Sequence, residues 1–145
     1  MTLITSPSRM VGGIELVHAG AQFVYSGGAV DYGHRQRTHL WRHRLESPTW
    51  AVYCPICAND DFPDLQTLMM RNELALFTAA RCVFLLDGMF TVGTPVEIYQ
   101  RITHRPPPTV CLIHPGDPGA FVRTWAAAGA AVVQSVEEAI EWLGA

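Results

Sequence analysis

The chain has 145 residues, a formal net charge of −3 and ten basic side chains, all of them arginine, so chemistry that needs a lysine, such as a Schiff base or the P-loop lysine, is excluded. A mildly acidic chain has no electrostatic basis for holding a polyanion across a broad face, and we therefore expect no nucleic-acid polymer as partner. No apolar run approaches the ~20 residues that cross a bilayer and no secretory leader pattern is evident, which predicts a cytoplasmic protein without a membrane partner.

From residue 21 onward, short β-like runs alternate with helical stretches, as is typical of a parallel sheet with helices on both faces. Residues 1–20 are predicted to be an N-terminal extension or an extra edge strand, and residues 21–145 a single domain. Ser135 and Glu138 have the spacing of a capping box at the last helix. In chain order the predicted elements are strand 21–25, helix 34–46, strand 50–54, helix 64–80, strand 82–86, a helix from Pro95, strand 109–113, helix 120–128, strand 130–134 and helix 135–143.

Ligands of an open parallel sheet bind beyond the carboxyl ends of its strands, where the strand order reverses. This rule directs attention to three segments. They are a predicted turn at Ser26, Gly27 and Gly28, the loop 55–61, and the segment 87–97.

The four cysteines do not predict a metal or cofactor. Cys54 and Cys57 have the spacing of a redox pair or of half a zinc site, but no second pair of ligands completes four. A loop with two small residues is favoured over both chemical interpretations. Cys82 and Cys111 fall inside apolar runs and are predicted core residues.

The segment from Asp87 to Ile98 runs from a strand end through a glycine turn into a helix. Thr94 suits the N-cap, Pro95 the first helical position and Glu97 the third. Two interpretations are open: Thr94 and Glu97 form a capping box that only satisfies the backbone, or Glu97 is a carboxylate held at the ligand crevice, able to attack an anomeric carbon. Local spacing favours the capping box.

Residues 92–98, Val-Gly-Thr-Pro-Val-Glu-Ile, resemble the glycine-threonine-x-x-glutamate motif of the nucleoside 2-deoxyribosyltransferases and the related nucleoside 5′-monophosphate N-glycosidases. Residues 23–31, Phe-Val-Tyr-Ser-Gly-Gly-Ala-Val-Asp, are similar to the opening strand and glycine loop of that family. The resemblance covers residues 21–145. It implies that Glu97 is the nucleophile and that Tyr25 positions it.

The expected fold is a flavodoxin-like, or Rossmann-like, five-stranded sheet in the order 2-1-3-4-5, and the resemblance implies a homodimer or higher oligomer. The implied activity is cleavage of the N-glycosidic bond of a nucleoside or nucleoside 5′-monophosphate, with the sugar passed to a base (a transferase) or to water (a hydrolase). Asp31 is a candidate general acid or sugar contact. The candidate substrate-binding residues are Ser26, Gly27, Gly28, Asp87, Gly93 and Thr94.

Two positions depart from the family pattern: Arg81 stands where an aspartate is usual, and Thr91 where an aspartate or serine is common. Arg81 could favour an anionic ligand such as a nucleotide, or could lie at a surface helix end. These departures support an alternative function, a non-catalytic nucleotide-binding or sensor module of the same fold. Arg42 is expected on a wet or subunit-facing helix surface, and Met69 and Met70 are expected to fill packing gaps.

Overall fold

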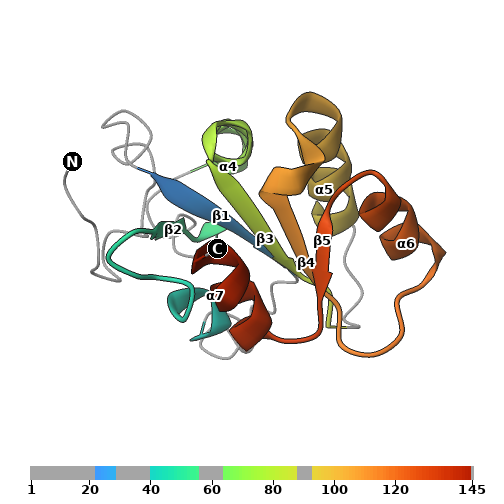
Figure 1. The fold of residues 1–145 in the computed structure, drawn as a ribbon. Helices are drawn as coiled ribbons and strands as arrows, with labels where there is room; N and C mark the ends of the chain where they lie inside the picture. The colour runs from blue at the N-terminus through green and yellow to red at the C-terminus, as the bar shows by residue number, and fades with distance from the viewer. Residues whose placement is uncertain (1–21, 29–39, 56–63, 88–92, 145) are drawn as a thin grey trace.

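A computed structural model describes residues 22–28, 40–55, 64–87 and 93–144. Within them, five strands form a wholly parallel sheet in the order β2-β1-β3-β4-β5 (Figure 1), which confirms the predicted α/β fold and strand order. The predicted strands are displaced by at most three residues at either end. The strands are β1 (Phe23–Gly28), β2 (Ala51–Tyr53), β3 (Arg81–Leu85), β4 (Val110–Ile113) and β5 (Ala131–Val133).

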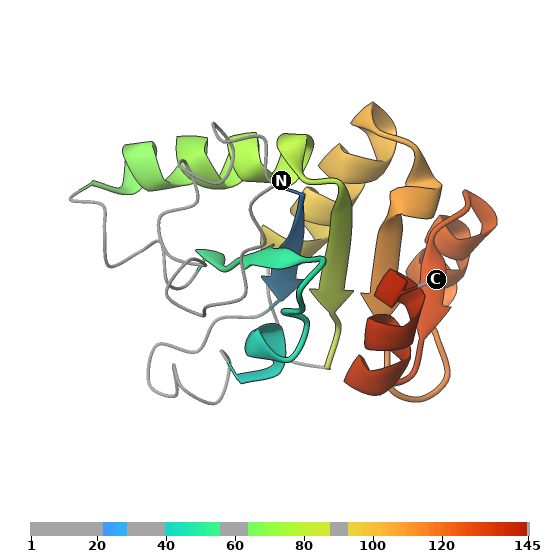
Figure 2. The ribbon, with the colours of Figure 1, turned by 60° about the vertical axis from the view of Figure 1, so that its left-hand side comes forward.

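Helices cover both faces of the sheet (Figures 1 and 2). One face packs against α4, α5 and α6, and the other against α7 and the helical turn at residues 40–43. The described helices are α4 (Leu65–Thr78), α5 (Gly93–His104), the 3-10 turn η4 (Pro107–Thr109), α6 (Ala120–Ala127) and α7 (Val136–Gly144). None of them is long and apolar enough to cross a membrane.

Alternate residues of the central strands enter two separate cores, because side chains of a strand point to opposite faces in turn. Tyr25 and Phe84 belong to the core beneath α4 and α5, whereas Val24 and Val83 belong to the core beneath α7. Burial on both faces explains why these strands are almost continuously apolar. Tyr25 therefore enters the core on the side of α4 and α5.

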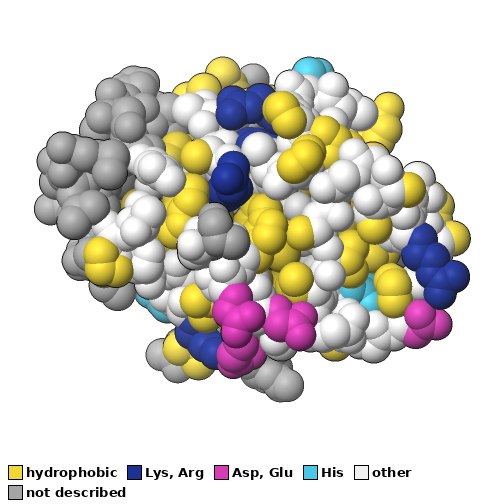
Figure 3. Space-filling view, viewed as in Figure 1, with side chains coloured by type: hydrophobic (Ala, Val, Ile, Leu, Met, Phe, Trp, Pro, Cys, Tyr) yellow, Lys and Arg dark blue, Asp and Glu magenta, His cyan; other side chains and the backbone are white. Residues whose placement is uncertain are grey.

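The predicted helix start at Ser135 is confirmed, but the reciprocal bond of the predicted capping box reaches the amide one residue earlier, at Gln134. The Ser135 hydroxyl accepts from the Glu138 amide at 3.2 Å, and the Glu138 carboxylate accepts from the Gln134 amide at 2.7 Å. Acidic side chains gather over α7 on the surface (Figure 3), where Glu137 pairs with Arg44.

Two local predictions need correction. Ser26, Gly27 and Gly28 do not form a turn, because they continue β1 and pair with residues 83–85 of β3. Of the predicted helix 34–46, the described part is helical only at residues 40–43. The prediction for residues 1–20 lies outside the described residues.

Candidate active site

The Tyr25 hydroxyl donates a hydrogen bond to Glu97 Oε1 at 3.0 Å, which joins β1 to the second turn of α5. The helix begins at Gly93, so Thr94 lies inside the first turn and the predicted N-cap position is wrong. Within the described residues, no hydrogen bond returns from Glu97 to the backbone of its own helix, in contrast to Glu138. The Glu97 carboxylate is therefore directed at the sheet.

Gly27 makes room for this carboxylate. A Cβ atom at position 27 would lie 3.2 Å from Glu97 Oε2 and 2.3 Å from Cδ1 of the buried Phe84 ring. Any larger residue would therefore displace one of these groups. The role of Gly27 is steric, because this residue leaves room for the Glu97 carboxylate beside Phe84, its register partner on β3.

Burial changes the acid–base properties of the pair. Loss of solvent raises the pKa of Glu97 to about 7, while the Tyr25 hydrogen bond and the Arg42 charge both act to lower it. The pKa of Tyr25 is raised well above its ordinary value, first by burial and then by the neighbouring carboxylate. A carboxylate that titrates near neutrality is common at catalytic sites.

Arg42 is fully buried, so its predicted place on a wet helix surface is wrong. Its Nε donates to the Ser26 carbonyl and its Nη2 to the Gly28 carbonyl, each at 3.4 Å. The strand β2 ends at Tyr53, which pairs with Tyr25, so Arg42 supplies donors to β1 beyond the end of β2. The guanidinium carbon also lies 4.9 Å from the centre of the Trp41 ring.

A cavity of about 720 Å³ opens over this pair, between α4 and α5. Met69 and Met70 line it with 62% and 64% of their surfaces exposed, so the expectation that they fill packing gaps is wrong. The volume of the cavity lies within the range of small-molecule binding sites. The described lining consists of Tyr25, Gln66, Met69, Met70, Asn72, Glu73, Leu76, Gly93, Val96, Glu97 and Gln100.

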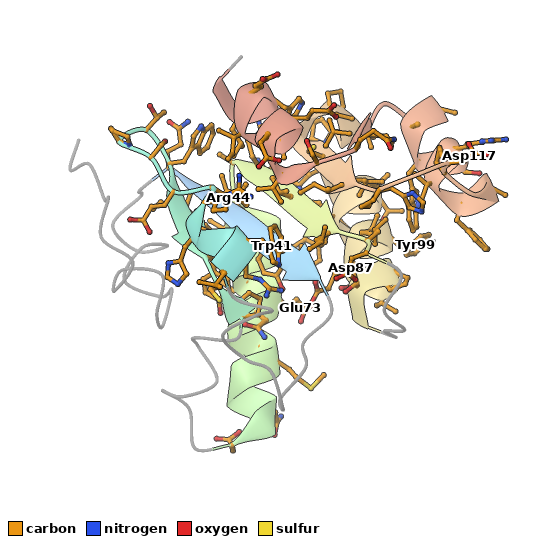
Figure 4. The ribbon with its side chains drawn as sticks, turned by 90° about the horizontal axis from the view of Figure 1, so that it is seen from below. Trp41, Arg44, Glu73, Asp87, Tyr99 and Asp117 are labelled. Carbon is orange, nitrogen blue, oxygen red and sulfur yellow. The ribbon has the colours of Figure 1, made fainter. Side chains whose placement is uncertain are left out.

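Glu73 is a second carboxylate in the lining. The run Arg71-Asn72-Glu73 resembles related sequences of the same family, but the sequence predicts no role for Glu73. It lies on α4, whereas Glu97 lies on α5, so the two acids come from different walls. Figure 4 looks onto the carboxyl ends of the strands and shows Glu73 beside the sheet, whereas Tyr99 and Asp117 lie toward α5 and α6. Glu73 stands two and three residues before the buried Ala75 and Leu76, a spacing that is ordinary for an exposed helix position and does not indicate a catalytic acid. The cavity is what brings it to the same site as Glu97.

The other predicted site residues lie in varied places. Ser26 is buried and its hydroxyl donates to the Tyr53 carbonyl at 2.7 Å, so it does not line the described cavity. Gly93 lines the cavity and Thr94 is buried beside it. Gly28 lies at the end of β1, and Asp87 is exposed after β3; neither belongs to the described lining. Asp31 lies outside the described residues.

Arg81 does not reach the cavity. It is the first residue of β3, and its guanidinium carbon lies 5.7 Å from the centre of the Trp142 ring of α7, on the opposite face of the sheet from Glu97. The interpretation of Arg81 as a contact for an anionic ligand is therefore wrong, and so is its placement at a helix end. Thr91 lies outside the described residues.

The cysteines that the structure describes, Cys54, Cys82 and Cys111, are buried. Burial raises the pKa of both Cys82 and Cys111 to about 12, which agrees with their predicted place in the core. Cys57 lies outside the described residues, so the favoured interpretation of Cys54 and Cys57 as small loop residues stays a prediction.

A search of protein-family models finds no match to this chain, and a search of curated proteins likewise finds none.

Proposed function

We propose that this protein cleaves the N-glycosidic bond of a nucleoside or nucleoside 5′-monophosphate, with Glu97 as the nucleophile. The observation that carries the proposal is the orientation of Glu97: its carboxylate meets the Tyr25 hydroxyl at the floor of an open cavity instead of capping its own helix. The resemblance of residues 23–31 and 92–98 to the nucleoside 2-deoxyribosyltransferases supports the same chemistry.

In the proposed first step, a Glu97 oxygen forms a bond to C1′ while the bond from C1′ to the base nitrogen breaks. The electron pair of that bond goes to the base, and the Glu73 carboxyl group relays a proton from water to the base nitrogen. A carboxyl group on the facing wall of the same cavity suits this role. The products are the free base and a glycosyl ester of Glu97.

In the second step, Glu73 takes a proton from the acceptor, whose oxygen or nitrogen attacks C1′ and releases Glu97. Water as acceptor makes the protein a hydrolase, and a second base makes it a transferase. Tyr25 keeps the carboxylate in line by its hydrogen bond, and Gly27 keeps the space beside it open.

The test is release of free base from a panel of nucleosides and their 5′-monophosphates, followed by chromatography. We expect Glu97→Ala to lower the rate by at least about 10³-fold. Glu141→Ala, which removes an exposed carboxylate from α7, serves as the matched control and should retain the wild-type rate. Release that survives Glu97→Ala, or no release from any member of the panel, would contradict the proposal.

The alternative, a non-catalytic nucleotide-binding module, predicts tight nucleotide binding by calorimetry without turnover. The sequence supports this alternative through Arg81 and Thr91. The support from Arg81 is weak, because this side chain lies on the face of the sheet opposite to Glu97.

The homo-oligomer implied by the resemblance is also part of the proposal. Exposed apolar side chains flank the cavity on both helices, and such patches are frequent at subunit contacts. Analytical ultracentrifugation tests it, with a monomer at micromolar concentration as the contradicting result. The exposed apolar side chains that flank the cavity are Met69, Met70 and Leu74 on α4, and Val96 and Tyr99 on α5.

A further inference from the structure

Two tyrosines of neighbouring strands connect the sheet to opposite walls of the cavity. Tyr25 and Tyr53 are register partners of β1 and β2, and their rings stack with centres 5.6 Å apart and planes 16° apart. The Tyr25 hydroxyl bonds Glu97 on α5, whereas the Tyr53 hydroxyl donates to Asn72 Oδ1 on α4 at 2.6 Å. Tyr53 is buried, so its ring is a fixed support for Asn72.

This contact determines which end of the Asn72 amide can meet a ligand. A separation of 2.6 Å is typical of a hydroxyl donating to an oxygen and is shorter than bonds from an amide nitrogen. The amide oxygen is therefore engaged, and Nδ2 retains two N–H donors. Within the described part of the chain, no group accepts a hydrogen bond from Asn72 Nδ2. Asn72 belongs to the cavity lining, so these donors are placed to meet a ligand.

We propose that Asn72 is a specificity-determining residue that donates a hydrogen bond from Nδ2 to a carbonyl oxygen of the substrate's base. This inference rests on the proposed function, because Glu73 must reach the base nitrogen and thereby places the base along α4, next to Asn72. The thioether side chains of Met69 and Met70 on the same wall suit the face of a planar ring. The expected substrates carry a base with an exocyclic oxygen, as in 6-oxopurines and 4-oxopyrimidines.

The experiment compares kcat/KM for nucleosides that differ at this group and at the adjacent ring nitrogen, which carries a hydrogen in the oxo form: inosine with adenosine, and uridine with cytidine, each also as the 2′-deoxy form. We expect wild-type protein to prefer the oxo member of at least one pair by about tenfold or more, because a site with a directed donor rejects an amino group in place of the acceptor. Asn72→Asp replaces the donor with an acceptor and should reverse that preference. Asn72→Ala should bring the ratio of kcat/KM for the oxo nucleoside to kcat/KM for its amino counterpart close to one.

Two further variants separate the role of Asn72 from general damage. Tyr53→Phe removes the hydroxyl that orients the amide, so the preference should weaken while Asn72 is intact. Gln134→Glu makes the same amide-to-acid change at an exposed position outside the described cavity lining, and it should keep the wild-type order of preference. Circular dichroism melting of each variant reports whether it folds.

The outcomes distinguish this inference from the proposed function. Base release with an oxo preference that Asn72→Asp does not change overturns the inference and leaves the proposed function standing. If no nucleoside is cleaved, the proposed function fails, and calorimetry with the free bases hypoxanthine, adenine, uracil and cytosine decides the inference. Equal binding of oxo and amino bases, or a preference that Asn72→Asp leaves unchanged, then overturns it as well.

Discussion

Tyr25 and Glu97 are 72 positions apart in the chain, yet the phenolic hydroxyl of Tyr25 lies 3.0 Å from Glu97 Oε1. The bond connects a fully buried strand residue with a carboxylate that faces a cavity. It therefore fixes the position of the carboxylate and favours its charged form at the same time.

Replacing Tyr25 by phenylalanine removes this hydrogen bond and leaves the ring in the core. Loss of a hydrogen bond to a charged group costs roughly 1.5–3 kcal/mol, so we expect kcat/KM for base release to fall about 10- to 100-fold. The pKa of Glu97 should also rise above about 7, because the bond lowers it in the wild type. A plot of kcat/KM against pH measures both effects: activity should rise with pH as Glu97 ionises, with the midpoint at higher pH in Tyr25→Phe. An unchanged midpoint would contradict this account.

Alanine at position 27 places a methyl group against Phe84 and Glu97. Overpacking of this kind costs about 1–3 kcal/mol, and we expect both a lower melting temperature and reduced base release. Gly144→Ala is the matched control, because nothing lies within 4 Å of a Cβ atom there. Thermal melting of the two variants tests the claim, and equal melting temperatures would refute it.

Replacing Arg42 by methionine leaves the Ser26 and Gly28 carbonyls without the donors that Arg42 gives them. Unsatisfied buried carbonyls and loss of a buried guanidinium should together lower the free energy of unfolding by roughly 2–4 kcal/mol. Arg44→Met changes an exposed arginine two residues away and should have little effect, because exposed ion pairs contribute little. Urea denaturation distinguishes them, and similar midpoints for the two variants would contradict the role given to Arg42.

Burial of Glu97 should make the protein less stable at alkaline pH than Glu97→Gln. The folded-state pKa of about 7 lies above the value of 4.5 expected in the unfolded chain, so the folded protein binds more protons between these values. Stability contributed by the protonated form is consequently lost as pH rises from about 4.5 through about 7. Glu97→Gln keeps an acceptor for Tyr25 without the charge, and its advantage should be on the order of 2 kcal/mol at pH 8 and small at pH 4.5. Melting curves at the two pH values measure the stability difference between Glu97→Gln and the wild type. A difference that does not change with pH would contradict the claim that burial raises the pKa of Glu97.

Much of the fold could be predicted from the sequence because its signals are local. Continuous apolar runs at Trp50 to Cys54 and Cys82 to Leu86 indicate strands buried on both faces, and the Ser135 and Glu138 spacing indicates a helix start; the structure confirms these predictions. The turn predicted at the glycines after Tyr25 is wrong, because glycine is typical of turns but is also required where a strand passes close to a side chain, as Gly27 passes Phe84.

The sequence by itself determined the layered parallel sheet and identified Glu97 and Tyr25 as candidates, since periodicity, helix-start residues and short motifs are properties of neighbouring positions. Tertiary structure alone decided that Glu97 turns away from its own helix, that Arg42 is buried against β1, and that Arg81 lies on the opposite face. It also brought Asn72 and Glu73 of α4 to the same cavity as Glu97. Each of these side-chain positions depends on which segments, distant in the sequence, pack against one another in the folded protein. Such packing produces no regular spacing of residues along the chain.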